Sequence, residues 1–583
     1  MLSSTGKAHK LALTITLVSV GTLLSFVCLK ADAGPTGTTL DSSSNPGQFL
    51  PSQSSQEYNA RRRRELAPQE EQDAAKFDFG KQAPQIGLET TSFFVNDVTF
   101  EGNNLVDTAT LSALATPFKG KQTNLDELTQ LVEKVNQVYW DKGYLTTQAV
   151  IPPQDVSYGT LKIQIYEGKL GKLNLDGNKY TRSSVIMNQV DLKEGDVINF
   201  RDLEKNLNRV NTQNRYNLKA SLAPGSQTGE TDVTIKVADP NPWQITPTFD
   251  NQGRPFIGYY RSGVEVANYN LTGRGDRAQV GFNRSEGANT VLGSYTTPIG
   301  KYGTEVGVLG GFSNVRLEGV ASDVLGKAYN ASAFVQQPLN KKRTMLLDLA
   351  ANYKHIESDV NDVRVNTDEI RSATLGFSFN EFDRWGRTYG RVANTLGASI
   401  LGGNWGFYKA EGYATRLFTL PYDNLLILRA SGQYSPTDLP SAEGYAVGGA
   451  YSVRGYTEGL LIGDSGYTLS AEDRWPIPFL KNVSPWWHDR VRGAVFLDMG
   501  QTFLDKNNVR FSAFNSNSPI LIGAGAGLRV SLSQYLSGFV DVGFPLVNRE
   551  STEPNSFPTA RVHFGLRSEL INQGQYTNGY HPN

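Results

Sequence analysis

Ile522-Gly-Ala-Gly-Ala-Gly-Leu-Arg-Val-Ser-Leu532 predicts a β-strand with two different faces, because every second residue in it is apolar. The residues in between are small, polar or charged: Gly523, Gly525, Gly527, Arg529 and Ser531. Successive side chains of a β-strand point to opposite faces, so this strand has one apolar face and one polar face. The pattern recurs in Leu426–Ser431 and Arg561–Arg567. It is typical of a transmembrane β-barrel with lipid outside and a wet lumen inside, although a soluble sandwich also alternates, with its apolar face inward.

The N-terminus favours the barrel, because it has the features of an export signal. The apolar run Leu11–Leu29 follows Lys10, and Ala31-Asp-Ala33 fits the small-x-small cleavage pattern. We therefore predict a signal peptide over residues 1–33, with an uncleaved membrane anchor as the alternative, since the run is nearly long enough to span a bilayer. No other window has the roughly 20 continuous apolar residues that a membrane helix requires, so insertion into a membrane would require a closed barrel.

Composition supports a large antiparallel sheet and excludes several functions. The chain of 583 residues has 58 Gly and 10% aromatic residues. Its 56 Lys and Arg nearly balance 57 Asp and Glu, which argues against a nucleic-acid partner that is held by broad phosphate neutralisation. The single cysteine, Cys28, would leave with the signal peptide, so no disulfide is expected. No Cys or His spacing suits a metal, and we predict neither a metal nor a cofactor.

Residues 92–239 contain an internal repeat. Val98-Thr-Phe-Glu-Gly102 and Leu173-Asn-Leu-Asp-Gly177 open the two copies, each as a strand that ends in a turn. Apolar residues at helical spacing follow in each copy: Leu125, Leu128, Leu131, Val132, Val135 and Val138 in the first, and Leu203, Leu207 and Val210 in the second. Two strands close each copy: Leu145–Ile151 and Leu161–Tyr166, then Leu218–Leu222 and Asp232–Val237. We predict two tandem α+β domains, 92–167 and 168–239.

The rest of the chain divides into a linker and the barrel. Residues 34–91 are mostly polar and read as a linker, with a candidate helix over 55–67 that ends before Pro68. Arg61–Arg64 in this helix could steer a partner, sit in a pore or form a solvated charge run. Residues 240–583 are the predicted barrel with a polar C-terminal tail; about 340 residues accommodate roughly 14 to 18 strands.

Two motifs in the predicted barrel indicate its function. Val453-Arg-Gly-Tyr456 lies in a long glycine-rich stretch, and Phe496-Leu-Asp-Met-Gly500 follows it on a predicted strand. They resemble the sixth extracellular loop and the Phe-x-Asp-x-Gly strand of the BamA-like outer-membrane superfamily. The resemblance implies that Val453, Arg454, Gly455 and Tyr456 fold back into the lumen. It also implies that Arg454 pairs with Asp498 on the strand of Phe496, Asp498 and Gly500. A guanidinium can bind a carboxylate through two parallel hydrogen bonds in such a partly dehydrated lumen.

The finer resemblance is to the two-partner secretion transporters, called TpsB or the ShlB/FhaC/HecB hemolysin-activator type. It rests on the two repeats, the candidate helix over 55–67 and barrel phrases such as Gly258-Tyr-Tyr-Arg261 and Tyr295-Thr-Thr-Pro298. It implies two POTRA domains, a barrel of about 16 strands and a helix that plugs the pore. The polar tail beyond Leu570 departs from the family, whose barrels usually end at the last strand.

The resemblance also implies location and partners. The protein would be a monomer in outer-membrane lipid of a Gram-negative-type bacterium, with its POTRA domains in the periplasm. It would be inserted by the outer-membrane assembly machinery and would export a large, unfolded, TpsA-like exoprotein. The alternative is a BamA- or TamA-like insertase that assembles other barrels. A plastid import channel and a diffusion porin agree less well with the signal peptide and the tandem domains.

An enzyme is not predicted, and no catalytic residue is assigned. Gly463-Asp-Ser-Gly466 resembles the nucleophile motif of trypsin-like proteases, but no His stands in a matching context. Gly523-x-Gly525-x-Gly527 lies on a strand with no helix behind it, which removes the usual mechanism of phosphate binding.

Overall fold

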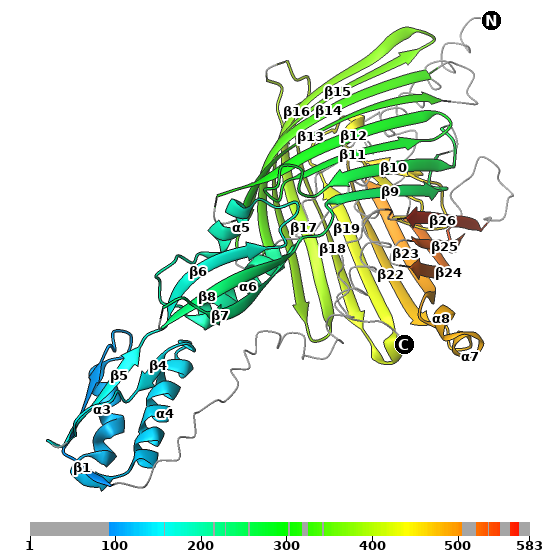
Figure 1. Cartoon of the computed structure of the whole chain (residues 1–583). Coiled ribbons are helices and arrows are strands. Elements are labelled where there is room, and N and C mark those ends of the chain that lie inside the picture. Colours follow the sequence, from blue (N-terminus) through cyan, green and yellow to red (C-terminus); the bar gives the residue numbers. More distant parts are fainter. Residues whose placement is uncertain are drawn as a thin grey trace, which may run out of the picture. The chain divides into compact units, whose positions relative to one another are not determined.

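Figure 1 shows the computed structural model of the chain. It describes residues 92–570 apart from 157, 214–215, 228, 255–256, 301–302, 318–323, 341–342, 401, 504–519, 534–535, 548–559 and 569. The signal peptide expected over 1–33, the linker 34–91 with its helix 55–67, and the polar tail lie outside the described residues. The described residues divide into two compact units, one ending at Pro240 and the other beginning at Asn241.

The first α+β domain is a small sheet with helices packed on it. Its elements are β1 (Phe93–Val95), β2 (Asp97–Glu101), α3 (Thr108–Ala115), η3 (Thr116–Phe118), β3 (Lys121–Thr123), α4 (Leu125–Asp141), β4 (Gln148–Val150) and β5 (Thr160–Tyr166). The main sheet has the order β2-β5-β4, with β2 parallel and β4 antiparallel to β5. Strands β1 and β3 form a separate pair.

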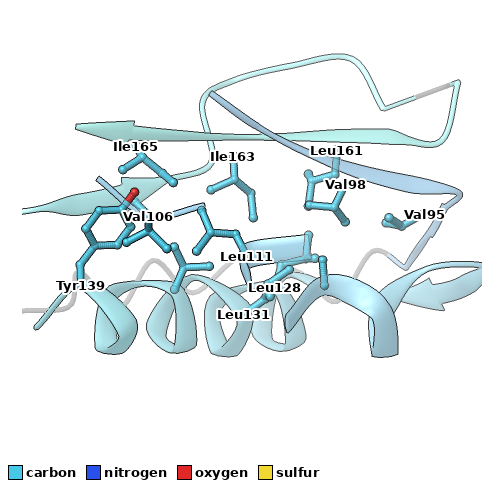
Figure 2. Packing of buried hydrophobic residues seen from close by; sticks show 13 residues of the cluster. Val95, Val98, Val106, Leu111, Leu128, Leu131, Tyr139, Leu161, Ile163 and Ile165 are labelled. Atoms are coloured by element: carbon cyan, nitrogen blue, oxygen red, sulfur yellow. The ribbon is translucent and has the colours of Figure 1, made fainter. Parts of the chain in front are cut away.

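Helix α4 forms because its sequence supplies both a cap and an apolar stripe. The Asn124 side chain accepts a hydrogen bond from the backbone N–H of Glu127 at 2.9 Å and so caps the N-terminus. Leu128 and Leu131, three residues apart on one face, are fully buried against the sheet (Figure 2). Leu125, predicted on the same face, is instead 44% exposed, because it is the first residue of the helix and lies beyond the edge of the core.

The second α+β domain repeats this arrangement without the extra strand pair. Its elements are β6 (Lys169–Asp176), α5 (Ser183–Val190), α6 (Phe200–Gln213), β7 (Asn217–Pro224) and β8 (Glu230–Ala238), in the sheet order β6-β8-β7. The two domains touch: the backbone N–H of Phe200 donates to the carbonyl of Gly143 at 2.9 Å. Leu145 packs on the core of the second domain. The predicted strand Leu145–Ile151 is therefore shorter in the structure, where β4 begins at Gln148.

The second unit is a closed antiparallel barrel of 16 strands, which lies within the range predicted from the sequence. The strands are β9 (Trp243–Asp250), β10 (Arg261–Asn268), β11 (Arg277–Arg284), β12 (Ala288–Ile299), β13 (Thr304–Leu317), β14 (Val324–Pro338), β15 (Met345–Val360), β16 (Val363–Asp383), β17 (Gly386–Gly397), β18 (Phe407–Thr419), β19 (Leu425–Tyr434), β22 (Ser465–Pro476), β23 (Val491–Phe503), β24 (Ile520–Ser533), β25 (Leu536–Pro545) and β26 (Arg561–Ser568). Strand β26 pairs with β9 and closes the ring.

Side chains alternate between the two faces of the barrel wall as the sequence predicts. On β23, Val495 and Leu497 are 45% and 53% exposed, whereas Phe496 and Asp498 are 5% and 1% exposed. The apolar face is therefore the outer face, as expected for a wall in lipid. Ile427 is an exception to the predicted polar inner face of β19: it is buried in an apolar cluster with Leu417 and Leu425.

In the part of the chain that the structure describes, no helix is both long enough and apolar enough to cross a membrane.

We predict that Leu131→Ala lowers the free energy of unfolding of the first α+β domain by about 2–5 kcal/mol, because it leaves a cavity in a packed core. The matched control is Leu125→Ala, which removes a side chain that is 44% exposed and should cost less than about 0.5 kcal/mol. Urea denaturation of the unit that ends at Pro240 measures both. Equal losses in the two variants would contradict the packing described here.

Candidate functional site in the barrel lumen

The connection between β19 and β22, residues 435–464, folds into the lumen of the barrel. It contains a short helix, η5 (Ser441–Glu443), and a pair of short strands, β20 (Tyr445–Val447) and β21 (Leu461–Gly463). The predicted motif Val453-Arg-Gly-Tyr456 lies between these two strands, at the tip of the loop. We call this segment loop 435–464.

Arg454 at the tip is held by three carboxylates. It is 5% exposed, and its Nε and Nη2 donate to the two oxygens of Asp498 at 2.7 and 2.9 Å. Its Nη1 donates to Glu472 at 2.7 Å and to Asp541 at 3.3 Å. The ring centroid of Phe496 lies 3.5 Å from the Arg454 Cζ, so the guanidinium also packs on an aromatic face. The pairing of Arg454 with Asp498 that the resemblance implied is thus present, as part of a larger cluster.

Three further arginines bind the same carboxylates. Glu472 accepts from Arg474 Nε at 2.5 Å, from Arg529 Nη2 at 3.1 Å and from Arg429 Nη1 at 3.3 Å. Arg529 also binds both oxygens of Asp541, at 2.6 and 3.0 Å. Each of the three buried carboxylates is therefore bound by at least one guanidinium, and this attraction offsets part of the cost of keeping charges in a dehydrated site.

No motif in the sequence identifies Glu472, Asp541 and Arg529 as members of this cluster. A signal for two of them exists, since Glu472 and Arg529 alternate with the outward residues of β22 and β24. Alternation shows only that a charge points to the lumen. The register between β22, β23, β24 and β25 decides which of these charges meet.

Gly455 allows the loop tip to touch the barrel wall. Its φ is 97°, a conformation that side chains disfavour, and a Cβ there would lie 2.9 Å from the backbone carbon of Phe544 and from the nitrogen of Pro545. Gly523 on β24 leaves matching room, because a Cβ at that position would lie 2.0 Å from the carbonyl oxygen of Arg454. The two glycines thus permit backbone-to-backbone contact between loop and wall.

Val453 and Tyr456, which precede and follow Arg454 in the sequence, bury their side chains between the loop tip and the wall. Both are fully buried, and the Tyr456 hydroxyl lies 2.7 Å from the carbonyl of Val547 and 2.9 Å from that of Ile522, either of which can accept its proton. A Cβ at Gly500 would lie 3.0 Å from a methyl group of Val453, so the glycine of the strand motif leaves room for the loop. All seven residues of the two motifs therefore meet at one place on the wall.

The stem of the loop packs on an apolar part of the lumen. Leu439 and Ala442 belong to a buried cluster with inward-facing residues of β13, β14, β15, β16 and β18. These residues are Val315, Ala328, Ile356, Ile370 and Phe407. Apolar side chains on the inner face of a wet barrel are unexpected, and here the stem covers them.

Glu443 in η5 adds ion pairs to this stem contact. Its carboxylate pairs with Lys354 of β15 and, at 2.5 Å, with Lys409 of β18. In the strand order of the closed barrel, several other strands separate β15 from β23 and β24, where the loop tip is bound. Loop 435–464 therefore crosses the lumen and binds the wall on both sides.

The protease-like motif has a structural role. The Asp464 carboxylate accepts the backbone N–H of Leu439 at 2.9 Å, and the Ser465 hydroxyl donates to the carbonyl of Ser435. Among the described residues there is also no group of three or more His, Cys, Asp or Glu that could hold a metal ion.

Three comparisons with known proteins agree. Residues 229–530 match the family "Haemolysin secretion/activation protein ShlB/FhaC/HecB", residues 93–168 match a ShlB-type POTRA domain, and residues 169–239 match the POTRA family described as a surface antigen variable number repeat. The heme/hemopexin transporter protein HuxB of Haemophilus influenzae (strain 86-028NP) is 25% identical over 76% of this chain and 82% of its own length. The outer membrane transporter CdiB of Dickeya dadantii (strain 3937) is 24% identical over 79% and 84%.

A solved structure shows the same fold. CdiB from Escherichia coli superposes with a TM-score of 0.56 at 22% identity, covering 92% of this chain and all of that chain. The match to the family model extends over more than half of the sequence, from the end of the second α+β domain into β24. The chain is an outer-membrane transporter with periplasmic POTRA domains, and it belongs to the ShlB/FhaC/HecB family of haemolysin secretion and activation proteins.

Proposed function

We propose that this transporter exports a large unfolded exoprotein and that loop 435–464 closes the lumen until the exoprotein is engaged. The observation that carries the proposal is the buried guanidinium of Arg454, which binds the loop tip to three strands of the wall, β22, β23 and β25. Such a contact holds one geometry while it is complete and is costly to leave half broken. A loop held in this way has two discrete positions, bound and released, as a gate requires.

The POTRA domains would recognise the exoprotein before it enters the barrel. Strand β7 lies at the edge of the second periplasmic sheet and pairs with β8 alone among the described strands. An extended segment of an unfolded chain can add to such an edge through main-chain hydrogen bonds. We propose residues 92–167 and 168–239 as the two recognition domains.

We propose that the residues of the lumen catalyse no reaction and that the transporter is a monomer. The carboxylates of Glu472, Asp498 and Asp541 are all engaged by guanidinium groups. Transport would then draw on folding of the exoprotein outside the cell.

We expect Arg454→Ala to reduce secretion of the exoprotein strongly while the amount of inserted barrel stays unchanged. The substitution removes the guanidinium that binds the buried carboxylate of Asp498 and releases the loop tip from the wall. Arg364→Ala, on a side chain that is 45% exposed, is the matched control. Quantification of the exoprotein in the medium and of the heat-modifiable barrel in the membrane gives both readouts. Normal secretion from the Arg454 variant would refute the proposed closure.

We expect Gly455→Ala to raise the ion conductance of the barrel in planar bilayers, because the added Cβ would meet backbone atoms of β25 and force the tip off the wall. Gly281→Ala is the control, since a Cβ at that position has no neighbour within 4 Å. If both variants conduct like the wild type, the tip does not close the lumen.

Deletion of the gene should remove one or two large proteins from the culture medium and leave the other outer-membrane barrels at normal abundance. Quantitative proteomics of medium and outer membrane tests this. Broad depletion of other barrels, with the medium little altered, would instead support the insertase alternative.

A further inference from the structure

The connection between β22 and β23, residues 477–490, exposes an unusual number of large apolar side chains. It contains two short helices, α7 (Leu480–Val483) and α8 (Pro485–His488), which Figure 1 shows at the lower ends of β22, β23 and β24. Phe479 is 65% exposed, Val483 is 71% exposed, and Trp486 and Trp487 are 45% and 43% exposed. The chain enters β9 from the periplasmic domains and alternates direction at each strand, so this connection lies on the periplasmic side.

The connection is ordered by specific contacts. The Arg490 guanidinium donates to the carbonyl of Trp486 and to that of Leu532, both at 3.2 Å, and its Cζ lies 4.6 Å from the Trp486 ring centroid. The carbonyl of Arg490 accepts the N–H of Ser531 at 2.9 Å. The rings of Trp486 and Trp487 meet edge to face, 4.8 Å apart. The apolar side chains therefore stand on a fixed platform joined to the end of β24.

This platform continues the lipid-facing side of the wall. Val491 has the same outward orientation on β23 as Val495 and Leu497, which are 45% and 53% exposed, yet it is only 8% exposed itself. Helix α8 lies close to the start of β23, which it precedes in the chain by two residues. The helices thus adjoin the barrel wall where it meets the periplasm.

The chemistry of the platform fits the headgroup layer of a membrane. Tryptophan is enriched where an apolar core meets water, because its ring is mostly apolar and its N–H can still find a partner. Lys481 and Arg490 flank the aromatic residues in the sequence, and Asp489 is the one carboxylate among residues 477–490. Cations beside an apolar face favour anionic lipid headgroups.

We propose that residues 477–490 bind the periplasmic leaflet of the outer membrane, with Phe479, Val483, Trp486 and Trp487 inserted among the lipids. A lipid surface is favoured over a protein partner because the exposed residues directly precede β23, whose outer face carries exposed apolar side chains. The anchor fixes the ends of β22 and β23, the strands that carry Glu472 and Asp498. This inference concerns the membrane contact and does not depend on the proposed gating.

Spin-label accessibility in the full-length protein tests the proposal. In a Cys28→Ser background, Val483→Cys is labelled and the protein is reconstituted in nanodiscs of phosphatidylethanolamine and phosphatidylglycerol. Leu497→Cys on the outer face of β23 is the lipid control, and Ser226→Cys in the turn between β7 and β8 is the water control. We expect the label at position 483 to lie about 5–10 Å into the boundary between headgroups and acyl chains, with several-fold less access to a nickel chelate than at position 226.

Two outcomes would overturn the proposal. One is a label at position 483 that is as accessible to the nickel chelate as the label at position 226. The other is protection that appears only when periplasmic protein is added, which would assign the platform to a protein partner. Lys481→Glu should weaken the protection at position 483 in anionic nanodiscs but not in nanodiscs of phosphatidylethanolamine and phosphatidylcholine, and equal effects in both would count against the role of lipid charge.

Discussion

A polypeptide in the hydrocarbon core of a membrane must satisfy every backbone N–H and C=O by itself, and the rest of this structure depends on that constraint. The chain meets it by closing 16 antiparallel strands into a ring, with β26 returning to β9. Successive side chains of a strand point to opposite faces, and closure gives these faces different surroundings, so residues such as Leu497 face lipid and residues such as Asp498 face the lumen. The charged cluster can exist only because this second face is shielded from lipid.

Within the lumen, the guanidinium of Arg454 organises the loop that crosses it. Taking charges out of water is costly, and the attraction between them repays the cost only when the geometry is good and few hydrogen-bonding groups are left over. The bidentate pair with Asp498, the bond to Glu472 and the stacked ring of Phe496 meet this requirement. Because such a cluster tolerates little displacement, it determines one position of the loop tip. This specificity, more than any gain in stability, is what a closed state requires.

The stem of loop 435–464 uses a different interaction for the same purpose. Leu439 and Ala442 cover inward-facing apolar residues, and Glu443 adds ion pairs to Lys354 and Lys409. Tip and stem together connect opposite parts of the wall, so release of either end would change the width of the free lumen. On the periplasmic side, the platform around Trp486 lies in the connection between β22 and β23 and exposes apolar side chains. The ends of β22 and β23 are thus constrained from both sides of the membrane.

The class of fold, the repeat and the pairing of Arg454 with Asp498 were predictable from the sequence, because each depends on local periodicity or on a motif that resembles a known family. The sequence left other features open. It did not determine that Leu125 lies outside the core, that Leu145 packs on the next domain or that Ile427 joins an inner apolar cluster. That Glu472, Arg529 and Asp541 share one site with Arg454 follows from the folded barrel, since strand register sets which inward residues meet. Periodicity specifies the face on which a side chain lies, whereas its neighbours on that face come from strands far apart in the sequence.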